Sequence, residues 1–229
     1  MYDFAIIGAG LFGSVFAHAA TRKGRKCLVV DKRRHIGGNC YTEVHDGIVV
    51  HTYGPHIFHT ACRTVWEFMT QFATFNGFVN RVKVHYRGRF FSFPINLMTL
   101  NQVLGIKTPE EAQALLAAPV EADNLEEWAL KAVGADLYEI FIRGYTAKQW
   151  MTAPALLPAS IIQRLPIRSN FDDRYYTDPY QGIPIGGYTP IFQQLLSGSE
   201  LRLNHDYFSD RASFNRMGRI VYTGRLDEY

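Results

Sequence analysis

Residues 2–31 read YDFAIIGAGLFGSVFAHAATRKGRKCLVVD, and this stretch decides the fold. An apolar run ends at Gly8, helical spacing follows over residues 11–23 up to Gly24, and a second apolar run, 26–30, ends at Asp31. Short continuous apolar runs are typical of strands buried on both faces of a parallel sheet. The stretch therefore predicts a strand–helix–strand unit of about 30 residues.

The turn between the first strand and the helix is glycine-rich. It reads Gly8-Ala9-Gly10-Leu11-Phe12-Gly13, a G-x-G-x-x-G pattern. Gly8 permits the tight turn, Gly10 lets the backbone approach a pyrophosphate, and Gly13 lets the helix pack closely on the strand. The amino end of the helix also favours negative charge. The pattern predicts a dinucleotide site, and its alternative is a glycine-rich turn without a ligand.

Asp31 and the glycine pair that follows it indicate which dinucleotide. A carboxylate at the end of the second strand accepts hydrogen bonds from ribose hydroxyls and disfavours a 2′-phosphate, so NADP is not expected. The alternative for Asp31 is a surface carboxylate that pairs with a neighbouring basic residue. Gly37-Gly38 resembles the signature of the flavoproteins that include glutathione reductase and the amine oxidases. Such a pair lets the chain approach the pyrophosphate from its other side, and we therefore expect FAD rather than NAD.

The composition is that of a soluble globular protein, with 229 residues of which 47% are hydrophobic and 20% charged. The net charge of +3 is scattered along the chain, so nucleic acid is not an expected partner. Three cysteines without CxxC spacing indicate reduced thiols. The first strand starts at Tyr2, which leaves no room for a signal peptide, and no apolar run approaches membrane-spanning length. We expect a cytoplasmic protein without a membrane partner.

Apolar periodicity predicts further elements along the chain. They are a helix over 62–75, a hairpin over 82–93 with its turn at Arg87-Gly88, a helical block over 97–150, a helix beginning at Thr189-Pro190, and strands over 200–203 and 219–222. Within the helical block, Thr108 with Glu111 and Asn124 with Glu127 match N-terminal capping patterns. Prolines and glycines over 151–187 predict irregular backbone.

His56 and His59 lie three residues apart behind Gly54-Pro55. No Asp, Glu or Cys stands in matching register, so a metal site is not expected. A structural role for these histidines and a place beside a cofactor both remain open from the residues alone.

Six strings together resemble one family. GPHIFHT (54–60), GLFGSV (10–15), DKRRHIGGNCYTE (31–43), GYTAKQW (144–150), YQGIPIGGYT (180–189) and VYTG (221–224) are similar in sequence and order to bacterial UDP-galactopyranose mutases. The resemblance implies an isomerase that interconverts UDP-galactopyranose and UDP-galactofuranose through an adduct between galactose and N5 of reduced FAD. It also implies a homodimer. Such chemistry is covalent catalysis with the cofactor as nucleophile.

The resemblance also implies roles for residues at matching positions. The cofactor contacts would be Gly8, Gly10, Phe12, Gly13, Asp31, Lys32, Gly38, Asn39, His56, Ile57, Asp206, Tyr207 and Gly224. The substrate contacts would be Asn80, Phe141, Tyr145, Thr146, Trp150, Arg164 and Tyr175. Arg164 and His59 would be the catalytic side chains, and Arg164 would close over the diphosphate, for which its planar fork is suited. From the residues alone, Trp150 could equally be a core residue and Arg164 a solvated loop charge.

The expected fold class is α/β, with an FAD-binding Rossmann-like βαβ domain, an inserted helical domain and part of an antiparallel substrate sheet. We expect residues 1–80 and 186–229 in the FAD domain, 81–94 and 151–185 in the sheet, and 95–150 in the helical insert.

Four departures from the family qualify the resemblance, the mildest being Asp31, which stands where glutamate is commoner and can equally accept ribose hydrogen bonds. Family members continue past the position of Tyr229, so we expect these 229 residues alone to bind FAD poorly and to lack measurable mutase activity. Met151 stands where a glycine is usual, and Arg225 stands where a proline is expected. The competing functions are an amine-oxidase-like FAD oxidoreductase and a non-catalytic remnant.

Overall fold

The computed structural model describes residues 1–116, 121–162 and 166–229, which form two compact units. Met1–Phe78 and Asp178–Tyr229 form the first, here called the sheet unit, and Val79–Thr177 form the second, the helical unit. We expected residues 81–94 and 151–185 to form a third part, the substrate sheet, separate from the FAD domain and the helical insert. In the structure the hairpin within 81–94 packs on helices of its own unit, and residues from 178 onward pair with the sheet unit. The three-part division stays a prediction for a longer protein.

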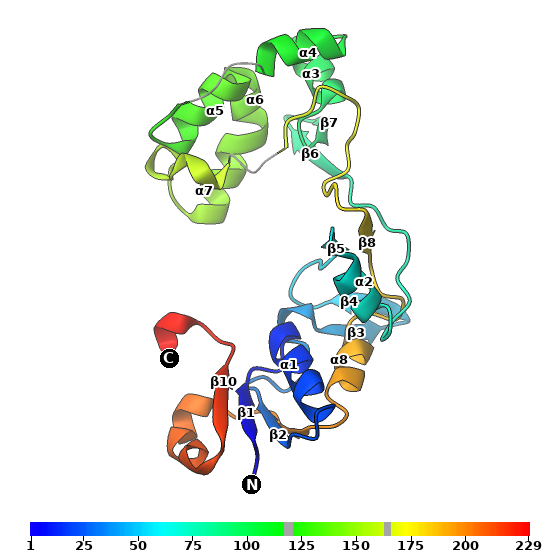
Figure 1. The fold of residues 1–229 in the computed structure, drawn as a ribbon. Coiled ribbons are helices and arrows are strands. Elements are labelled where there is room, and N and C mark those ends of the chain that lie inside the picture. Colours follow the sequence, from blue (N-terminus) through cyan, green and yellow to red (C-terminus); the bar gives the residue numbers. More distant parts are fainter. Residues whose placement is uncertain (117–120, 163–165) are drawn as a thin grey trace. The chain divides into compact units, whose positions relative to one another are not determined.

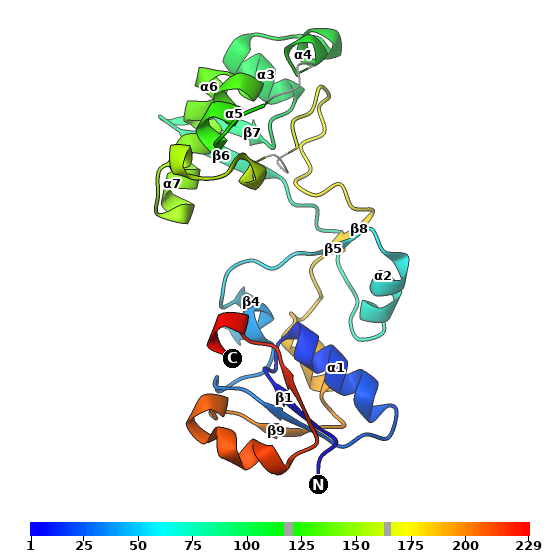
Figure 2. The same cartoon turned by 60° about the vertical axis from the view of Figure 1, so that its left-hand side comes forward.

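The sheet unit is built around four parallel strands in the order β10-β1-β2-β9 (Figures 1 and 2). Their bounds are β1 Phe4–Ile7, β2 Cys27–Val30, β9 Glu200–Arg202 and β10 Arg219–Tyr222. β1 pairs in register with β2 and with β10, so that Phe4 lies opposite both Cys27 and Arg219. The predicted strand–helix–strand unit and both C-terminal strands are confirmed, and with them the α/β class.

Helices cover both faces of this sheet (Figures 1 and 2). The helices α1 (Leu11–Thr21) and α8 (Thr189–Leu195) lie on one face, where Ile6 and Val29 join a buried cluster. The 3₁₀ segment η5 (Tyr207–Arg216) covers the other, where Ala5 and Leu28 join a second cluster. Because both faces are buried, these strands contain apolar residues without alternation.

Two small antiparallel sheets and a short helix complete the sheet unit. They are β3 (Thr42–His45) with β4 (Ile48–His51), β5 (Phe58–Thr60) with β8 (Tyr180–Gly182), and α2 (Arg63–Met69), besides the short 3₁₀ segments η1 (Gly38–Cys40) and η6 (Leu226–Glu228). The predicted helix over 62–75 ends early at Met69. Phe75 instead forms a β-bridge with Pro184, and its aromatic neighbours pack against α8, so tertiary pairing overrides the helical spacing.

The helical unit contains the remaining elements. They are β6 (Val82–Tyr86), β7 (Arg89–Phe93), α3 (Leu97–Leu104), α4 (Pro109–Leu116), α5 (Leu125–Val133), α6 (Ala135–Leu137), the π-helix η2 (Tyr138–Arg143), α7 (Gly144–Trp150), and the 3₁₀ segments η3 (Pro154–Leu156) and η4 (Ala159–Ile161). Both predicted caps are confirmed, because the Thr108 hydroxyl accepts from the Glu111 amide at 3.2 Å and the Asn124 side chain accepts from the Glu127 amide at 2.9 Å.

The hairpin β6–β7 covers one side of the helical core. Its turn residues Arg87 and Gly88 have φ angles of 47° and 77°, which is typical of a tight two-residue hairpin turn. Phe91 is buried together with side chains from α3, α5 and η2. The predicted hairpin is therefore confirmed. Within the described residues, no helix has the length and apolarity needed to cross a membrane.

Candidate functional site

A cavity of about 280 Å³ lies at the carboxyl edge of the parallel sheet. The last residues of three strands line it: Ile7 of β1, Val30 of β2 and Tyr222 of β10. From β1 the chain continues to β2, its neighbour on one side. The neighbour of β1 on the other side is β10, which comes from the C-terminal part of the chain. Ligands of open parallel sheets bind at such a position, where the strand order reverses.

Two glycine loops meet at this cavity. Gly10 opens α1 and Gly38 follows β2, and a Cβ atom placed on Gly38 would lie 3.0 Å from the Cα of Gly10. Gly13 faces away from the cavity, where a Cβ would overlap the carbonyl oxygen of Gly8. The two loops thus touch through bare backbone, and both line the cavity, where a pyrophosphate can lie close to them.

The amino end of α1 adds an electrostatic reason for an anion here. Gly10 is its N-cap, and no side chain caps the helix. The first-turn amide groups are therefore available to a ligand, and the helix dipole places partial positive charge beside them. The residues present fit a dinucleotide pyrophosphate.

Asp31 ties the first loop to the chain after β2. One carboxylate oxygen accepts a hydrogen bond from the Ala9 amide at 2.9 Å, and the other accepts from the Arg33 amide at 2.8 Å. Each oxygen keeps a second lone pair, so a ribose hydroxyl can still bind. The carboxylate thus orders the glycine loop as well as facing the cavity.

Positive charge stands next to this carboxylate. Lys32, Arg33 and Asn39 line the cavity. The Arg33 guanidinium donates to the Asn39 side-chain oxygen at 2.9 Å and lies 4.4 Å from the centre of the Tyr53 ring. These contacts hold a guanidinium beside the expected ribose position. Sequence reasoning missed Arg33, although its place in the Lys32-Arg33-Arg34 cluster was a visible signal.

The third wall comes from the C-terminal part of the chain. Asp206, Tyr207 and Gly224, which are predicted cofactor contacts, line the cavity. The Asp206 side chain caps η5 by accepting from the Phe208 amide at 3.0 Å. Lining residues that sequence reasoning did not select here are Ile7, Val30, Arg33, His205, Phe208, Tyr222, Thr223 and Glu228.

Four of the predicted cofactor residues do not line this cavity: Gly13, which packs on Gly8, and Phe12, His56 and Ile57. The Phe12 side chain on α1 is 67% exposed. His56 belongs to the turn before β5, where its amide donates to the His51 ring at 3.1 Å and its own ring bonds the Gly54 carbonyl at 2.8 Å. Ile57 follows it in the same turn and is partly buried.

His59, on β5, forms a close pair with Asp178. Its Nδ1 lies 2.6 Å from a carboxylate oxygen of Asp178, just ahead of β8. An ionised carboxylate only accepts, so Nδ1 carries the proton of this bond. Sequence reasoning missed Asp178, because the pairing of β5 with β8 that brings it close is long-range.

Three predicted substrate residues lie near one another in the helical unit. The Tyr175 amide donates to the Asn80 carbonyl at 2.8 Å. The Phe93 ring lies between Tyr175 and Phe141, with ring centroids at 6.2 Å and 6.0 Å. Phe141 is only 5% exposed, so in this structure it is a core residue that packs against the Phe93 ring.

The remaining predicted substrate residues lie on α7, except one. Tyr145 is 71% exposed and Trp150 is 48% exposed, so both rings are accessible, whereas Thr146 is buried. Trp150 is thus no core residue. Arg164 lies outside the described residues.

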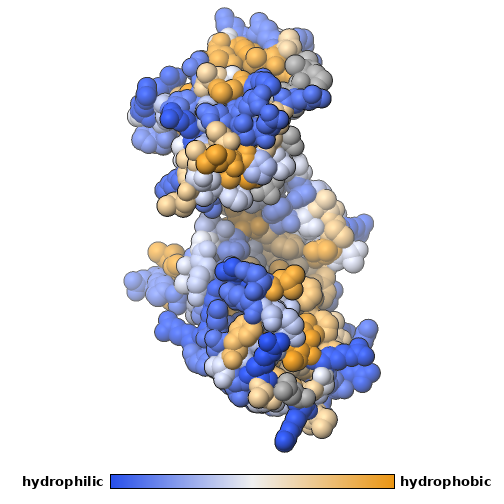
Figure 3. Space-filling model, turned by 90° about the vertical axis from the view of Figure 1, so that its left-hand side faces the viewer, coloured by the Kyte–Doolittle hydropathy of each residue, from blue (hydrophilic) through white to orange (hydrophobic). Residues whose placement is uncertain are grey.

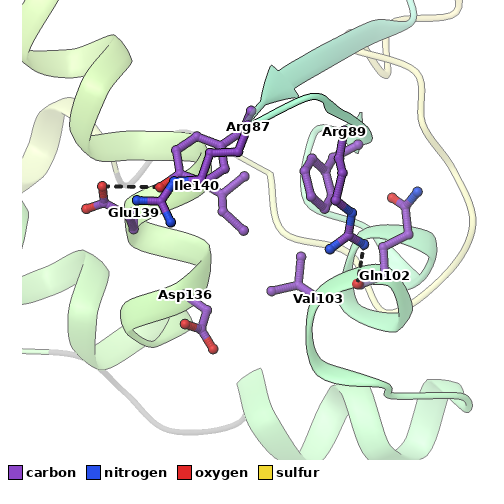
Figure 4. Close-up of a pocket in the computed structure, with 9 residues that line it drawn as sticks. Arg87, Arg89, Gln102, Val103, Asp136, Glu139 and Ile140 are labelled. Atoms are coloured by element: carbon purple, nitrogen blue, oxygen red, sulfur yellow. Dashed lines mark hydrogen bonds between the residues drawn. The ribbon is translucent and has the colours of Figure 1, made fainter.

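A second cavity, of about 350 Å³, lies in the helical unit between the hairpin tip and the helices (Figure 4). Arg87 lies on the side of Glu139 and Arg89 on the side of Gln102, with Asp136 below. Glu139 is already bonded by Arg143 at 2.9 Å. Two cations and two carboxylates line it, so their charges balance, and none of the predicted site residues that the structure describes is among the lining residues. Among the described residues, no group of three or more His, Cys, Asp or Glu could hold a metal ion.

A parallel sheet covered on both faces, with a glycine-lined cavity at its carboxyl edge, defines the Rossmann-like class of nucleotide-binding α/β proteins. The comparisons agree with this class. A family model described as an NAD(P)-binding Rossmann-like domain matches residues 6–72, and one described as UDP-galactopyranose mutase matches residues 140–229.

Curated relatives match along the whole chain. It is 39% identical to a dTDP-fucopyranose mutase of Escherichia coli, over 100% of this chain and 64% of that protein. It is 40% identical to a probable UDP-galactopyranose mutase of Klebsiella pneumoniae, over 99% of this chain and 61% of that protein. The chain thus spans somewhat less than two thirds of the length of these relatives.

A solved structure agrees in fold. The crystal structure of a reduced UDP-galactopyranose mutase matches with a TM-score of 0.64 and 20% identity, covering 88% of this chain and 49% of that one. The resemblance to UDP-galactopyranose mutases, which the sequence motifs predict, is confirmed.

Proposed function

We propose that this chain supplies the FAD-binding region and part of the substrate site of a nucleotide-sugar mutase that interconverts UDP-galactopyranose and UDP-galactofuranose. The observation that carries the proposal is the cavity at the carboxyl edge of the sheet, which is lined by predicted cofactor contacts from three distant parts of the chain. Identity of about two fifths to mutases along nearly the whole chain supports the reaction class.

The proposed work of the cavity is to hold the dinucleotide. The backbone of Gly10 and Gly38 would take the pyrophosphate, Asp31 the ribose, and Asp206 with Tyr207 the adenosine end. Lys32 and Arg33 would offset the negative charge of the diphosphate. Phe12, His56 and Ile57 would then belong to the part of the site nearer the flavin ring.

Reduced FAD, when bound, supplies an electron-rich ring nitrogen that can displace a diphosphate from an anomeric carbon. The protein's own part would be orientation and charge. His59, held by Asp178, can donate or accept a proton at Nε2. Tyr145 and Trp150 offer accessible rings for stacking, and Arg164 would bind the substrate diphosphate.

The sugar nucleotide is the finer part of the proposal. The two mutases compared above carry names with different substrates, UDP-galactose and dTDP-fucose, at nearly equal identity to this chain. The family model over residues 140–229 favours UDP-galactose, because that segment contains the predicted substrate residues of α7 and Tyr175.

The test uses the complete product of the reading frame that contains these residues. We expect flavin absorbance near one equivalent and, with dithionite, conversion of UDP-galactofuranose to UDP-galactopyranose without any electron acceptor. Conversion of dTDP-fucofuranose alone would show that the substrate is the dTDP-fucose pair and not the UDP-galactose pair. Acceptor-dependent oxidation of an amine would establish the oxidoreductase alternative. A product that binds no flavin and converts neither sugar would contradict the proposal.

A further inference from the structure

Arg168 is a buried cation of the helical unit that belongs to neither cavity. Its side chain is only 10% exposed. A buried guanidinium is costly unless hydrogen bonds and nearby negative charge compensate it. Here one nitrogen, Nη1, donates to two backbone carbonyls, of Asp172 at 2.7 Å and of Arg174 at 2.6 Å.

The second of these carbonyls belongs to a peptide group that is held on both sides. The Arg174 carbonyl and the Tyr175 amide are the two ends of one planar peptide. Arg168 binds the carbonyl, and the amide donates to the Asn80 carbonyl at 2.8 Å. Fixing this plane fixes the position of the Tyr175 Cα atom, so that only rotations about φ and the side-chain dihedrals remain to direct its ring.

The rest of the segment closes around the same guanidinium. The Arg168 amide donates to the Ile95 carbonyl at 3.0 Å, which anchors the residue to the chain ahead of α3. The Asp172 carboxylate lies 3.9 Å from Nη1 and receives two hydrogen bonds from the Arg174 side chain, at 2.8 and 2.9 Å. Those bonds lower the pKa of Asp172 to about 2, so it stays negative beside Arg168 at neutral pH.

We infer that Arg168 is a positioning residue of the substrate site, which sets the position of Tyr175 relative to Asn80 by pinning the peptide between Arg174 and Tyr175. The inference rests on the proposed function, since it takes Tyr175 as a contact of the sugar nucleotide. Arg168 itself touches no substrate in this account.

The first experiment is a double-mutant cycle on the complete reading-frame product. Arg168→Met keeps most of the apolar stem but loses the donors, and we expect KM for the sugar nucleotide to rise about tenfold with kcat within about twofold. Arg168→Lys should recover part of this loss, because an ammonium can still reach a carbonyl. Arg143→Met, at an exposed guanidinium of the same unit, is the matched control and should leave KM unchanged.

The cycle separates positioning from general stability. If Arg168 acts through Tyr175, then adding Arg168→Met to Tyr175→Ala should raise KM by less than about twofold. An equal rise of KM in both backgrounds, or a loss confined to kcat, would overturn the inference.

Hydrogen exchange gives a readout that does not need turnover. The Tyr175 amide should exchange at least about tenfold faster in Arg168→Met than in the unmodified protein, while amides of α5 keep their protection. Unchanged exchange at Tyr175 would overturn the inference. Absence of turnover in the unmodified protein would instead overturn the proposed function, so the two failures are distinguishable.

Discussion

Met151 is a residue whose type does not suit its backbone conformation. It follows α7 with φ of 52° and ψ of 30°, in the left-handed region, and it is 87% exposed. A residue with a Cβ is strained there by about 1–2 kcal/mol, whereas glycine is not. The departure noted in the sequence, methionine where the family has glycine, thus falls at a position whose conformation favours glycine.

Replacing Met151 with glycine should stabilise the protein. The relief of strain is partly offset by the greater freedom of glycine in the unfolded chain, which leaves a gain of about 0.5–1 kcal/mol. Urea unfolding of Met151→Gly against Met151→Ala measures it, since both variants lose the same exposed side chain. A glycine variant less stable than the alanine variant would contradict this reading of the turn.

The residues of the candidate site were predictable to different degrees. Gly10, Gly38 and Asp31 stand in a local pattern whose chemistry is readable from spacing, and the structure brings them to one cavity. Asp178 and Arg168 were not predictable. The partner of Asp178, His59, lies far away in the sequence and is brought close only by the pairing of β5 with β8. The carbonyls that Arg168 binds lie only four and six residues after it, but in irregular backbone whose turn the residue pattern does not specify.

At the scale of elements, Thr42 and Thr189 join β3 to α8. The Thr42 hydroxyl accepts from the amides of Tyr188 at 2.9 Å and Thr189 at 3.1 Å. The Thr189 hydroxyl donates to the Thr42 carbonyl at 2.6 Å and accepts from the Thr42 amide at 3.0 Å. Gly187 is required beside them, because its φ is 86° and a Cβ would overlap Thr42.

Thr42→Val should destabilise the sheet unit by about 1–3 kcal/mol, because two buried amides lose their acceptor without a change in shape. Thr52→Val is the control, since its exposed hydroxyl makes one bond, to Glu43 at 3.3 Å, and its loss should be within about 0.5 kcal/mol. Chemical denaturation of both variants decides. Equal effects would show that the two threonines do not join these elements as described.

His51, at the end of β4, makes the turn before β5 sensitive to pH. Its Nδ1 accepts from the His56 amide, which requires a neutral ring. Burial lowers the pKa of His51 below its ordinary value, and the nearby His56 lowers it further. A folded pKa below the unfolded one means that the stabilisation is complete above about pH 6.5 and is lost as pH falls through the lowered pKa.

We therefore expect the urea midpoint to fall between pH 7.5 and pH 5 by more in the unmodified protein than in His51→Gln. The glutamine can still accept a hydrogen bond but does not titrate in this range. Parallel pH dependence of the two proteins would exclude His51 as the source.

Elements were more predictable than their ends or their partners. The hairpin 82–93, the caps at Thr108 and Asn124 and the helix from Thr189 follow from local chemistry and are confirmed. The helix over 62–75 was wrong in its second half, because Phe75 is taken up in a long-range bridge that spacing cannot show.

At the scale of the whole molecule, the exposed apolar side chains are informative. Figure 3 shows one face, on which hydrophobic residues interrupt the hydrophilic surface of both units. Phe12, Tyr145 and Trp150 are among the exposed large side chains, and all three are predicted ligand contacts. Exposed aromatic rings are typical of surfaces that bind ligands or partners.

The division into two units was the least predictable feature of the fold. The sheet unit closes only because β9 and β10 return to strands formed by the first 30 residues. A pattern read along the chain identifies each strand but not the sheet to which it adds, since pairing depends on contacts between distant segments. Whether a longer product completes the fold in three parts stays a prediction.

The central claim is that bare backbone at Gly10 and Gly38 holds a flavin pyrophosphate, and Gly10→Ala tests it most directly. Gly10 has φ of −78°, and the nearest atom to an added Cβ is the Gly38 Cα at 3.9 Å, so the protein itself accommodates the methyl group. We expect FAD affinity, titrated by flavin fluorescence on the complete reading-frame product, to fall at least about thirtyfold while the melting temperature changes by less than about 3 °C. FAD bound as tightly as by the unmodified protein would contradict the account.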